Sequence, residues 1–209
     1  ACYGYPADRI KTIWNGLDHH GFYPASGSEQ HQFREQLGLK PDDFALLFVA
    51  ENFKLKGLAS ALKAIAALDD SIKSKVVLLV AGGDNSAAYM LQAVKLGIAD
   101  KVRFLGERRA IRELYVAADM LVYPSLYESF SNVCVEAAAC GLPAVMTSMA
   151  GAYSLFTHGK NAFIVKDATC IDEITASLEK YARMPERDRE LMSLAAIEVA
   201  KPLSWERHA

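Results

Sequence analysis

Apolar stretches and helical periods alternate along most of the chain. Continuously apolar runs predict strands at residues 44–50, 75–82, 102–105, 120–124, 143–147 and 162–165. Apolar residues at helical spacing predict helices at residues 58–68, 86–96, 111–118, from shortly after 129, 171–182 and 187–200. Strands this continuously apolar are covered on both faces, so the pattern predicts an α/β fold with a Rossmann-like, doubly wound parallel sheet.

The two ends of the chain fall outside this alternation. Residues 1 to about 26 are rich in Tyr, Gly and Pro, which is typical of a lead-in segment or interdomain linker. Residues 27–200 carry the alternation and are expected to form one domain. Residues 201–209 are expected to begin a further helix that is cut short. Because the chain starts at Ala1 rather than at a methionine, we expect it to be a fragment of a longer protein.

Charge and composition narrow the classes of function. The 23 basic and 25 acidic residues are interspersed and give a net charge of -2, so no basic surface for nucleic acid is expected. No apolar run approaches the roughly 18 residues that span a bilayer, and no signal peptide is expected. The four cysteines include no CxxC pair, which favours reduced thiols and a cytoplasmic protein. The five histidines show no metal-ligand spacing, so no metal site is expected.

A first candidate site follows the strand at residues 44–50. Ligands of open parallel sheets bind beyond the carboxyl ends of the strands, where helix N-termini present unpaired N–H groups. The loop there reads ENFKLKG and places Lys54 and Lys56 just before the next helix. Two ammonium groups beside a helix N-terminus can neutralise an anion without a metal. From this stretch alone, a solvated loop explains the two lysines as well.

A second candidate is the stretch YESFSNVCVEAAACGLP at residues 127–143. Ser129 or Ser131 is the expected N-cap of its helix. The N–H groups that such a cap leaves directed into the crevice belong to residues Phe130, Ser131 and Asn132.

Two carboxylates flank this expected helix start. Glu128 precedes the helix, and Glu136 lies about two turns inside it, within an otherwise apolar run. Carboxylates on both sides of an anion site suit a diphosphate with hydroxyls at each end, namely a ribose and a sugar. Alternatively, Glu136 pairs with a Lys or Arg of the fold, because an isolated buried carboxylate is costly.

The spacing from Glu128 to Glu136, followed by A-x-x-x-G-x-P, resembles the E-x7-E signature of the family 4 retaining glycosyltransferases of GT-B fold. Further stretches agree with that family in order, namely N-G-L-D (15–18), F-K-L-K-G (53–57), V-R-F-L-G (102–106), A-A-D (117–119) and S-M-A-G (148–151). The resemblance covers nearly the whole chain and is closest to lipopolysaccharide-core glucosyltransferases. It implies that the chain is the C-terminal, donor-binding half of such an enzyme.

The resemblance also implies roles for the acidic and basic residues. Glu136 takes the ribose hydroxyls, and Glu128 takes hydroxyls of the donor sugar as a positioning group. Lys56, helped by Lys54, neutralises the diphosphate leaving group. Many family members carry an arginine six residues before this lysine, where Ala50 stands here, so the lysine pair must supply the positive charge.

The resemblance also implies roles for the backbone N–H groups, for the residue beside the nucleobase and for a glycine. The N–H groups of residues 130–132 hold the diphosphate oxygens. Arg108 resembles the position that packs against the nucleobase, although the run E-R-R leaves its register open by one residue. Gly151 permits close approach of the backbone to the ligand.

The implied reaction transfers a hexose, with retention, from a nucleoside diphosphate sugar of the UDP-glucose type to a glycan or lipopolysaccharide acceptor. No metal and no cofactor are expected. A missing N-terminal domain binds the acceptor and makes any membrane contact, so the full-length protein is expected to be cytoplasmic or peripheral at the inner membrane. The fragment alone is expected to bind nucleotide without catalysing transfer.

Two other readings stay open at this point. A GT-B sugar-nucleotide epimerase shares the fold and the ligand but not the E-x7-E helix with its lysine loop. A non-catalytic nucleotide-binding module would keep Glu136 and the lysines while losing the sugar-facing acid, and Glu128 is present. A Rossmann dehydrogenase would need G-x-G-x-x-G after the first strand, which the loop after Ala50 lacks.

Overall fold

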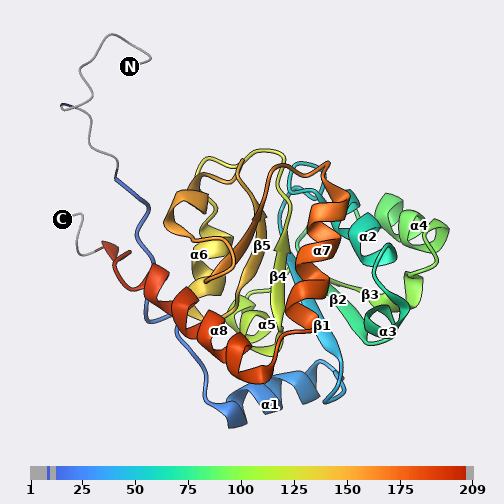
Figure 1. The fold of residues 1–209 in the computed structure, drawn as a ribbon, viewed down its shortest axis with the longest axis horizontal. Coiled ribbons are helices and arrows are strands. Elements are labelled where there is room, and N and C mark those ends of the chain that lie inside the picture. The colour runs from blue at the N-terminus through green and yellow to red at the C-terminus, as the bar shows by residue number, and fades with distance from the viewer. Residues whose placement is uncertain (1–8, 10–12, 206–209) are drawn as a thin grey trace.

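A six-stranded parallel sheet forms the centre of the structure (Figure 1). The computed structural model describes Arg9 and residues 13–205. The strands are β1 (Phe44–Val49), β2 (Val76–Ala81), β3 (Val102–Gly106), β4 (Met120–Tyr123), β5 (Ala144–Thr147) and β6 (Ala162–Val165). The doubly wound parallel sheet predicted from the sequence is confirmed, and every predicted strand is present to within one residue at each end.

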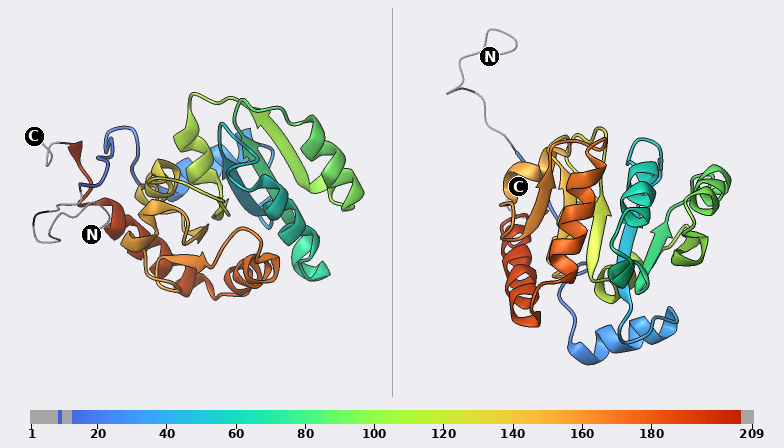
Figure 2. Two further views of the ribbon diagram at one scale, coloured as in Figure 1. Left: turned by 90° about the horizontal axis from the view of Figure 1, so that it is seen from above. Right: turned by 45° about the vertical axis from the view of Figure 1, so that its right-hand side comes forward.

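Helices cover both faces of this sheet (Figure 2). They are α1 (Gly27–Gln36), α2 (Leu58–Ala66), α3 (Asp70–Lys73), α4 (Ala87–Lys95), α5 (Ile111–Ala117), α6 (Asn132–Ala139), α7 (Ile171–Ala182) and α8 (Glu186–Ala200), with short 3-10 turns η2 (Ala99–Lys101) and η3 (Gly151–Leu155). Leu47 packs with α5 and α6 on one face, and its neighbour Leu46 packs with α2 and α7 on the other. Because successive strand residues point to opposite faces, a continuously apolar strand serves both apolar clusters.

The order of the strands places a switch point between β1 and β4. The sheet runs β3-β2-β1-β4-β5-β6, so the chain winds outward from β1 in one direction and from β4 in the other. The two central strands pair in parallel, with Leu46 opposite Met120. The loops that follow β1 and β4 therefore begin side by side, at the place where doubly wound sheets bind ligands.

Helix α1 is an element that the apolar pattern does not predict. Its N-cap Ser26 accepts a hydrogen bond from the backbone N–H of Glu29 at 3.2 Å, and none of its residues is buried. It packs near α5, where Arg112 forms an ion pair with Glu29 at 2.6 Å. Helix α1 lies at the bottom of Figure 1, beside the amino ends of the strands. Polar contacts and a single partly buried ring, that of Phe33, hold this helix, so a search for apolar periodicity misses it.

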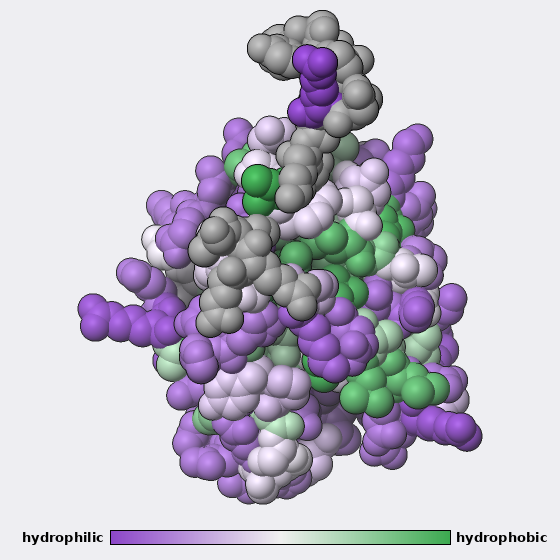
Figure 3. Space-filling view, turned by 90° about the vertical axis from the view of Figure 1, so that its left-hand side faces the viewer, coloured by the Kyte–Doolittle hydropathy of each residue, from purple (hydrophilic) through white to green (hydrophobic). Residues whose placement is uncertain are grey.

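The lead-in segment and the last described residues lie together. The N–H of Leu17 donates to the carbonyl of Leu203 at 3.0 Å. Figure 3 views the molecule from this side, where the surface is largely hydrophilic with separate apolar areas. The predicted linker and the predicted start of a further helix fall partly outside the described residues, and both stay predictions. No helix in the described part of the chain has the length and apolar character needed to cross a membrane.

Candidate functional site

The lysine loop is held against the loop that follows β4. The backbone N–H of Phe53 donates to the Asp84 carboxylate at 2.8 Å, which fixes the loop to the neighbouring strand end. Gly57 precedes α2 with φ 80°, and a Cβ at this position would lie 2.0 Å from the carbonyl oxygen of Pro124. Only glycine permits both this conformation and this approach. The contact brings the end of the lysine loop next to the segment that carries Glu128.

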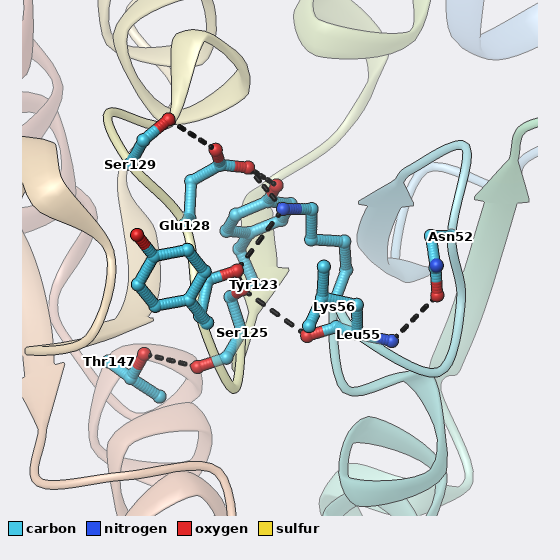
Figure 4. Close-up of polar contacts among 9 residues, drawn as sticks. Asn52, Leu55, Lys56, Tyr123, Ser125, Glu128, Ser129 and Thr147 are labelled. Atoms are coloured by element: carbon cyan, nitrogen blue, oxygen red, sulfur yellow. Dashed lines mark hydrogen bonds and ion pairs between the residues drawn. The ribbon is translucent and has the colours of Figure 1, made fainter.

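Lys56 and Glu128 form an ion pair across the two loops (Figure 4). Their side chains are 14% and 22% exposed. The Lys56 ammonium also donates to the Tyr127 carbonyl at 3.3 Å, and the Tyr123 hydroxyl donates to the Glu128 carboxylate at 3.1 Å. Burial raises the pKa of Glu128, but the hydrogen bonds and charge of Lys56, together with Tyr123, outweigh burial and lower it. Glu128 is therefore ionised at neutral pH.

Lys54 takes no part in this pair. Its side chain is exposed and makes no hydrogen bond or ion pair with the described residues. The solvated-loop interpretation therefore fits Lys54, whereas Lys56 is part of a partly buried polar cluster.

A second set of hydrogen bonds ties the loops after β1, β4 and β5 together (Figure 4). Thr147 at the end of β5 donates to the carbonyl of Ser125 at 2.6 Å, and the Ser125 hydroxyl lies 3.0 Å from the carbonyl of Tyr127. The N–H of Leu126 donates to the carbonyl of Leu55 at 2.9 Å. These bonds fix the backbone around Glu128 before any ligand is considered.

The N-terminus of α6 carries backbone strain. Ser131 precedes the helix with φ 85°, and among the described residues it is the one non-glycine residue with a positive φ. Its side chain does not cap the helix, and its buried Oγ has no partner among the described residues beyond a weak interaction with the Cys134 thiol. Ser131 is thus the residue at the predicted N-cap position, but the capping bond itself is absent. Strain and an orphaned hydroxyl of this kind are typical of functional sites.

The backbone N–H groups at this helix start have no acceptor among the described residues; they belong to Phe130, Ser131 and Asn132. Such groups, with the helix dipole behind them, bind anions. The lead-in segment reaches the same point. Asn15 donates to the Asn132 side chain at 3.1 Å, and the rings of Trp14 and Phe130 lie 5.8 Å apart.

Glu136 has a different environment from Glu128. Because α6 begins at Asn132, Glu136 is its fifth residue and lies about one turn inside it, so the expected depth of two turns was wrong. Its carboxylate accepts a hydrogen bond from the buried hydroxyl of Tyr115 on α5 at 2.8 Å. Burial raises the pKa of Glu136, and the bond from Tyr115 opposes that rise. No Lys or Arg in the described part of the chain pairs with it, so within these residues the alternative of an ion pair is not met.

Two further predicted residues lie at the same edge of the sheet. Arg108 is exposed in the loop after β3, with no polar partner for its side chain among the described residues. Gly151 begins η3, and a Cβ there would lie 2.0 Å from the carbonyl oxygen of Ser129. Close packing against the chain itself is thus one reason for glycine at position 151, and close approach to a ligand stays a prediction.

Two tyrosines of the site were missed by sequence reasoning. Tyr123 ends β4 and Tyr115 lies in α5, and each hydroxyl donates to one of the two carboxylates. The available signal was a phenol within an otherwise apolar element, since a buried Tyr hydroxyl usually finds a partner.

The described residues contain no group of three or more His, Cys, Asp or Glu side chains that could hold a metal ion. The expectation that no metal is used stays a prediction. A groove of about 1270 Å³ lies at the opposite end of the sheet, where Arg34 and Asp119 are among the lining residues. None of the predicted site residues lines that groove.

Comparisons with known proteins relate the whole chain to one family. The family model described as "Glycosyl transferases group 1" matches residues 29–197. A D-inositol 3-phosphate glycosyltransferase of Thermomonospora curvata is 33% identical over 98% of this chain and 50% of its own length. The chain thus spans about half the length of the curated relatives it matches.

Two solved structures share the fold. A crystal structure of WaaG, described as a glycosyltransferase involved in lipopolysaccharide biosynthesis, superposes with a TM-score of 0.86 at 24% identity and covers 95% of this chain and 54% of its own. The structure of Anabaena Alr3699/HepE in complex with UDP-glucose gives a TM-score of 0.77 at 27% identity, covering 96% and 55%. Both matches cover nearly all of this chain and about half of the solved one.

Proposed function

This chain belongs to the group 1 glycosyl transferases, and we propose that it is the donor-binding half of a retaining enzyme that transfers a hexose from a nucleoside diphosphate sugar. The observation that carries the proposal is the cluster at the switch point, where Lys56 and Glu128 meet beside the free N–H groups of α6. The relative Alr3699/HepE has been solved with UDP-glucose, which favours a donor of that type. Membership of a transferase family argues against an epimerase.

The positively charged groups of the site match the diphosphate of the donor. Transfer breaks the bond between the anomeric carbon and a diphosphate oxygen, and negative charge develops on the leaving group. The N–H groups of residues 130–132 and the ammonium of Lys56 would stabilise that charge, with Lys54 adding a second cation from the exposed face of the loop. We propose that these groups serve in place of a metal ion.

The two carboxylates suit the two polyhydroxyl parts of the donor. Glu128 stands in the loop before α6 and would accept hydrogen bonds from the transferred sugar. Glu136 lies further along the same helix and would accept them from the ribose. Arg108 would lie against the nucleobase, and Gly151 would let the backbone approach the ligand. Glu128 acts here as a positioning group, because its pairing with Lys56 keeps it ionised.

The acceptor belongs to the part of the enzyme that this chain does not contain. Because the chain spans about half of its relatives, we propose that a preceding domain binds a glycan or lipopolysaccharide acceptor and makes any membrane contact. The complete enzyme is then cytoplasmic or peripheral at the inner membrane, and this half alone binds nucleotide without transferring sugar.

Calorimetric titration of the 209-residue chain tests the donor assignment. UDP, GDP and ADP are added separately in buffer without divalent metal. We expect saturable binding of one nucleotide, lost in Glu136→Ala and kept in Glu35→Ala, a matched control on the exposed side of α1. Equal binding by both variants would contradict the role of Glu136, and no binding of any nucleotide would contradict the donor-domain proposal.

The sugar-facing role needs the complete enzyme. Glu128→Gln keeps the shape of the side chain but removes its charge, so hexose transfer should fall by at least tenfold, the change expected from a lost charge-assisted hydrogen bond. Near-normal turnover in this variant would contradict the role of Glu128.

A further inference from the structure

Glu136 is held by one neighbour that the proposed reaction does not explain. The hydroxyl of Tyr115 donates to Oε2 of Glu136 at 2.8 Å, while Oε1 makes no hydrogen bond with the described residues. Tyr115 is 1% exposed, so its hydroxyl is shielded from bulk water. The bond joins the middle of α5 to the middle of α6, two helices on the same face of the sheet.

No other group described around Glu136 can replace the hydrogen bond that Tyr115 donates to it. Among the described residues, the groups that interact electrostatically with it are Tyr115 on α5, Tyr123 on β4, Cys134 on its own helix and Cys140 at the C-cap of that helix. The Tyr123 hydroxyl is used by Glu128. Burial raises the pKa of both thiols, that of Cys140 to about 12, so neither carries charge near neutral pH. In the described part of the chain, the other elements in contact with α6, namely α8, β4, β5 and η3, add no charged partner for Glu136.

The ring of Tyr115 is fixed as firmly as its hydroxyl. It packs edge to face against Phe22 of the lead-in segment, with ring centroids 6.0 Å apart. A fixed ring gives the hydroxyl one direction, so the carboxylate of Glu136 is held in one orientation. A carboxylate that recognises vicinal hydroxyls gains from this restraint, because less side-chain entropy is lost on binding.

We propose that Tyr115 is a positioning residue for the nucleotide: its hydroxyl occupies Oε2 of Glu136, orients that carboxylate and leaves Oε1 to accept the ribose hydroxyls. The inference rests on the proposed function for its ligand, but the coupling between Tyr115 and Glu136 can be tested without any nucleotide. Burial favours the protonated form of Glu136, and the phenol hydrogen bond favours the ionised form.

The substitution Tyr115→Phe removes the hydroxyl and keeps the ring that packs on Phe22. Hydrogen bonds to charged groups are strong enough that the pKa of Glu136 should rise by about one to two units. Carboxyl carbon NMR of the 209-residue chain, followed as a function of pH, measures this directly. Tyr181→Phe is the matched control, because that buried phenol lies on α7 with no hydrogen bond to Glu136. An unchanged pKa of Glu136 in folded Tyr115→Phe would overturn the proposal.

Binding of UDP gives the second readout. An ionised Glu136 accepts the ribose hydroxyls, so affinity is present above its pKa and is lost as the pH falls through it. Tyr115→Phe should therefore bind UDP more weakly, by about tenfold or more, at pH values below the raised pKa of Glu136, and should approach the wild-type affinity as the pH rises above it. A purely structural role for Tyr115 would lower affinity by the same factor at every pH, and that result would overturn the proposal.

The wild-type chain provides a measurement that needs no variant. If the two groups are coupled, the ring carbon that bears the Tyr115 hydroxyl shifts with the same apparent pKa as the Glu136 carboxyl. Separate pKa values would overturn the coupling even if Tyr115→Phe does not fold. Failure of the wild-type chain to bind UDP, GDP or ADP would contradict the proposed function instead, and the NMR titration would still decide the role of Tyr115.

Discussion

Glu128 and Glu136 stand on opposite sides of one helix start, and each accepts a hydrogen bond from a buried tyrosine. Their surroundings differ in a single charged partner. Lys56 pairs with Glu128 and lowers its pKa against the effect of burial, whereas Glu136 has no cation and burial raises its pKa. Two carboxylates eight positions apart are thus prepared for different work: one is bound to a positive charge, and the other is held by a neutral phenol.

The comparison suggests a division of labour along α6. The Glu128 side of the site combines cation, carboxylate and free N–H groups, which suits the reacting diphosphate and sugar. On the Glu136 side, neutral groups hold a partly buried carboxylate that can accept hydrogen bonds. Such an acceptor suits hydroxyls that do not react. The predictions below test each side, starting with the largest expected effect.

Separating the two loops should have the largest effect. In Gly57→Ala the new Cβ would lie 2.0 Å from the Pro124 carbonyl at a residue with φ 80°, so we expect a loss of about 3 kcal/mol or more in the free energy of unfolding. Gly97→Ala is the control, because φ there is also positive, at 71°, but nothing lies within 4 Å. It should cost only about 1–2 kcal/mol. Similar losses in urea unfolding of both variants would contradict the packing of the lysine loop on the Glu128 loop.

Removal of the Lys56 ammonium should have the second largest effect on stability. Lys56→Ala leaves a partly buried carboxylate without its charged partner, so the free energy of unfolding should fall by about 1–3 kcal/mol. Lys95→Ala, an exposed lysine on α4, should leave stability within about 0.5 kcal/mol of wild type. The double variant Lys56→Met with Glu128→Gln should recover part of the loss, because no unpaired charge remains. If the double variant recovers none of the lost free energy of unfolding, the ion pair is not the reason why Lys56 stabilises the fold.

The strained residue at the helix start gives a smaller effect of opposite sign. Ser131→Gly relieves the positive φ and should raise the free energy of unfolding by about 1 kcal/mol. Ser131→Ala removes the same hydroxyl but keeps the strain, so it should not stabilise. Both variants should weaken UDP binding by a few fold if the orphaned hydroxyl faces the ligand. Thermal melts and UDP titrations of the pair separate strain from binding.

The smallest effect is a difference in pH dependence. A carboxyl with a lowered folded pKa adds stability above its unfolded pKa and loses it as the pH falls through the folded value. Glu128→Gln should therefore be less stable than wild type at neutral pH, with the gap closing in acid below the usual Glu pKa. A raised folded pKa has the opposite sign, so Glu136→Gln should equal or exceed wild-type stability at neutral pH. Urea unfolding at several pH values measures the free energy of unfolding of both variants. If both were less stable than wild type at neutral pH, or both more stable, the comparison would be contradicted.

Much of this fold was predictable from the chain. The strands are continuously apolar and bounded by turn residues, so their positions and their parallel arrangement follow from the pattern. The spacing of Glu128 and Glu136 and the lysine loop were also visible. What periodicity misses is largely polar structure: α1 has no fully buried residue, and hydrogen bonds and an ion pair hold it together with the partly buried Phe33.

The partners within the site could not be predicted from spacing. Tyr115 and Glu136 are hydrogen-bonded although they lie 21 positions apart in the sequence, and Lys56 and Glu128 are paired although they lie 72 positions apart. Both contacts depend on how the sheet brings separate elements together. The positive φ of Ser131 is set by the surrounding loops, and no local residue preference predicts it.

Amide NMR of the 209-residue chain, titrated in turn with UDP, GDP and ADP in buffer without divalent metal, tests the central claim most directly. The account predicts saturable shifts that are largest at residues 130–132 and in the lysine loop, residues 51–57. Shifts confined to the groove near Arg34 and Asp119 at the other end of the sheet, or no shifts at all, would contradict it.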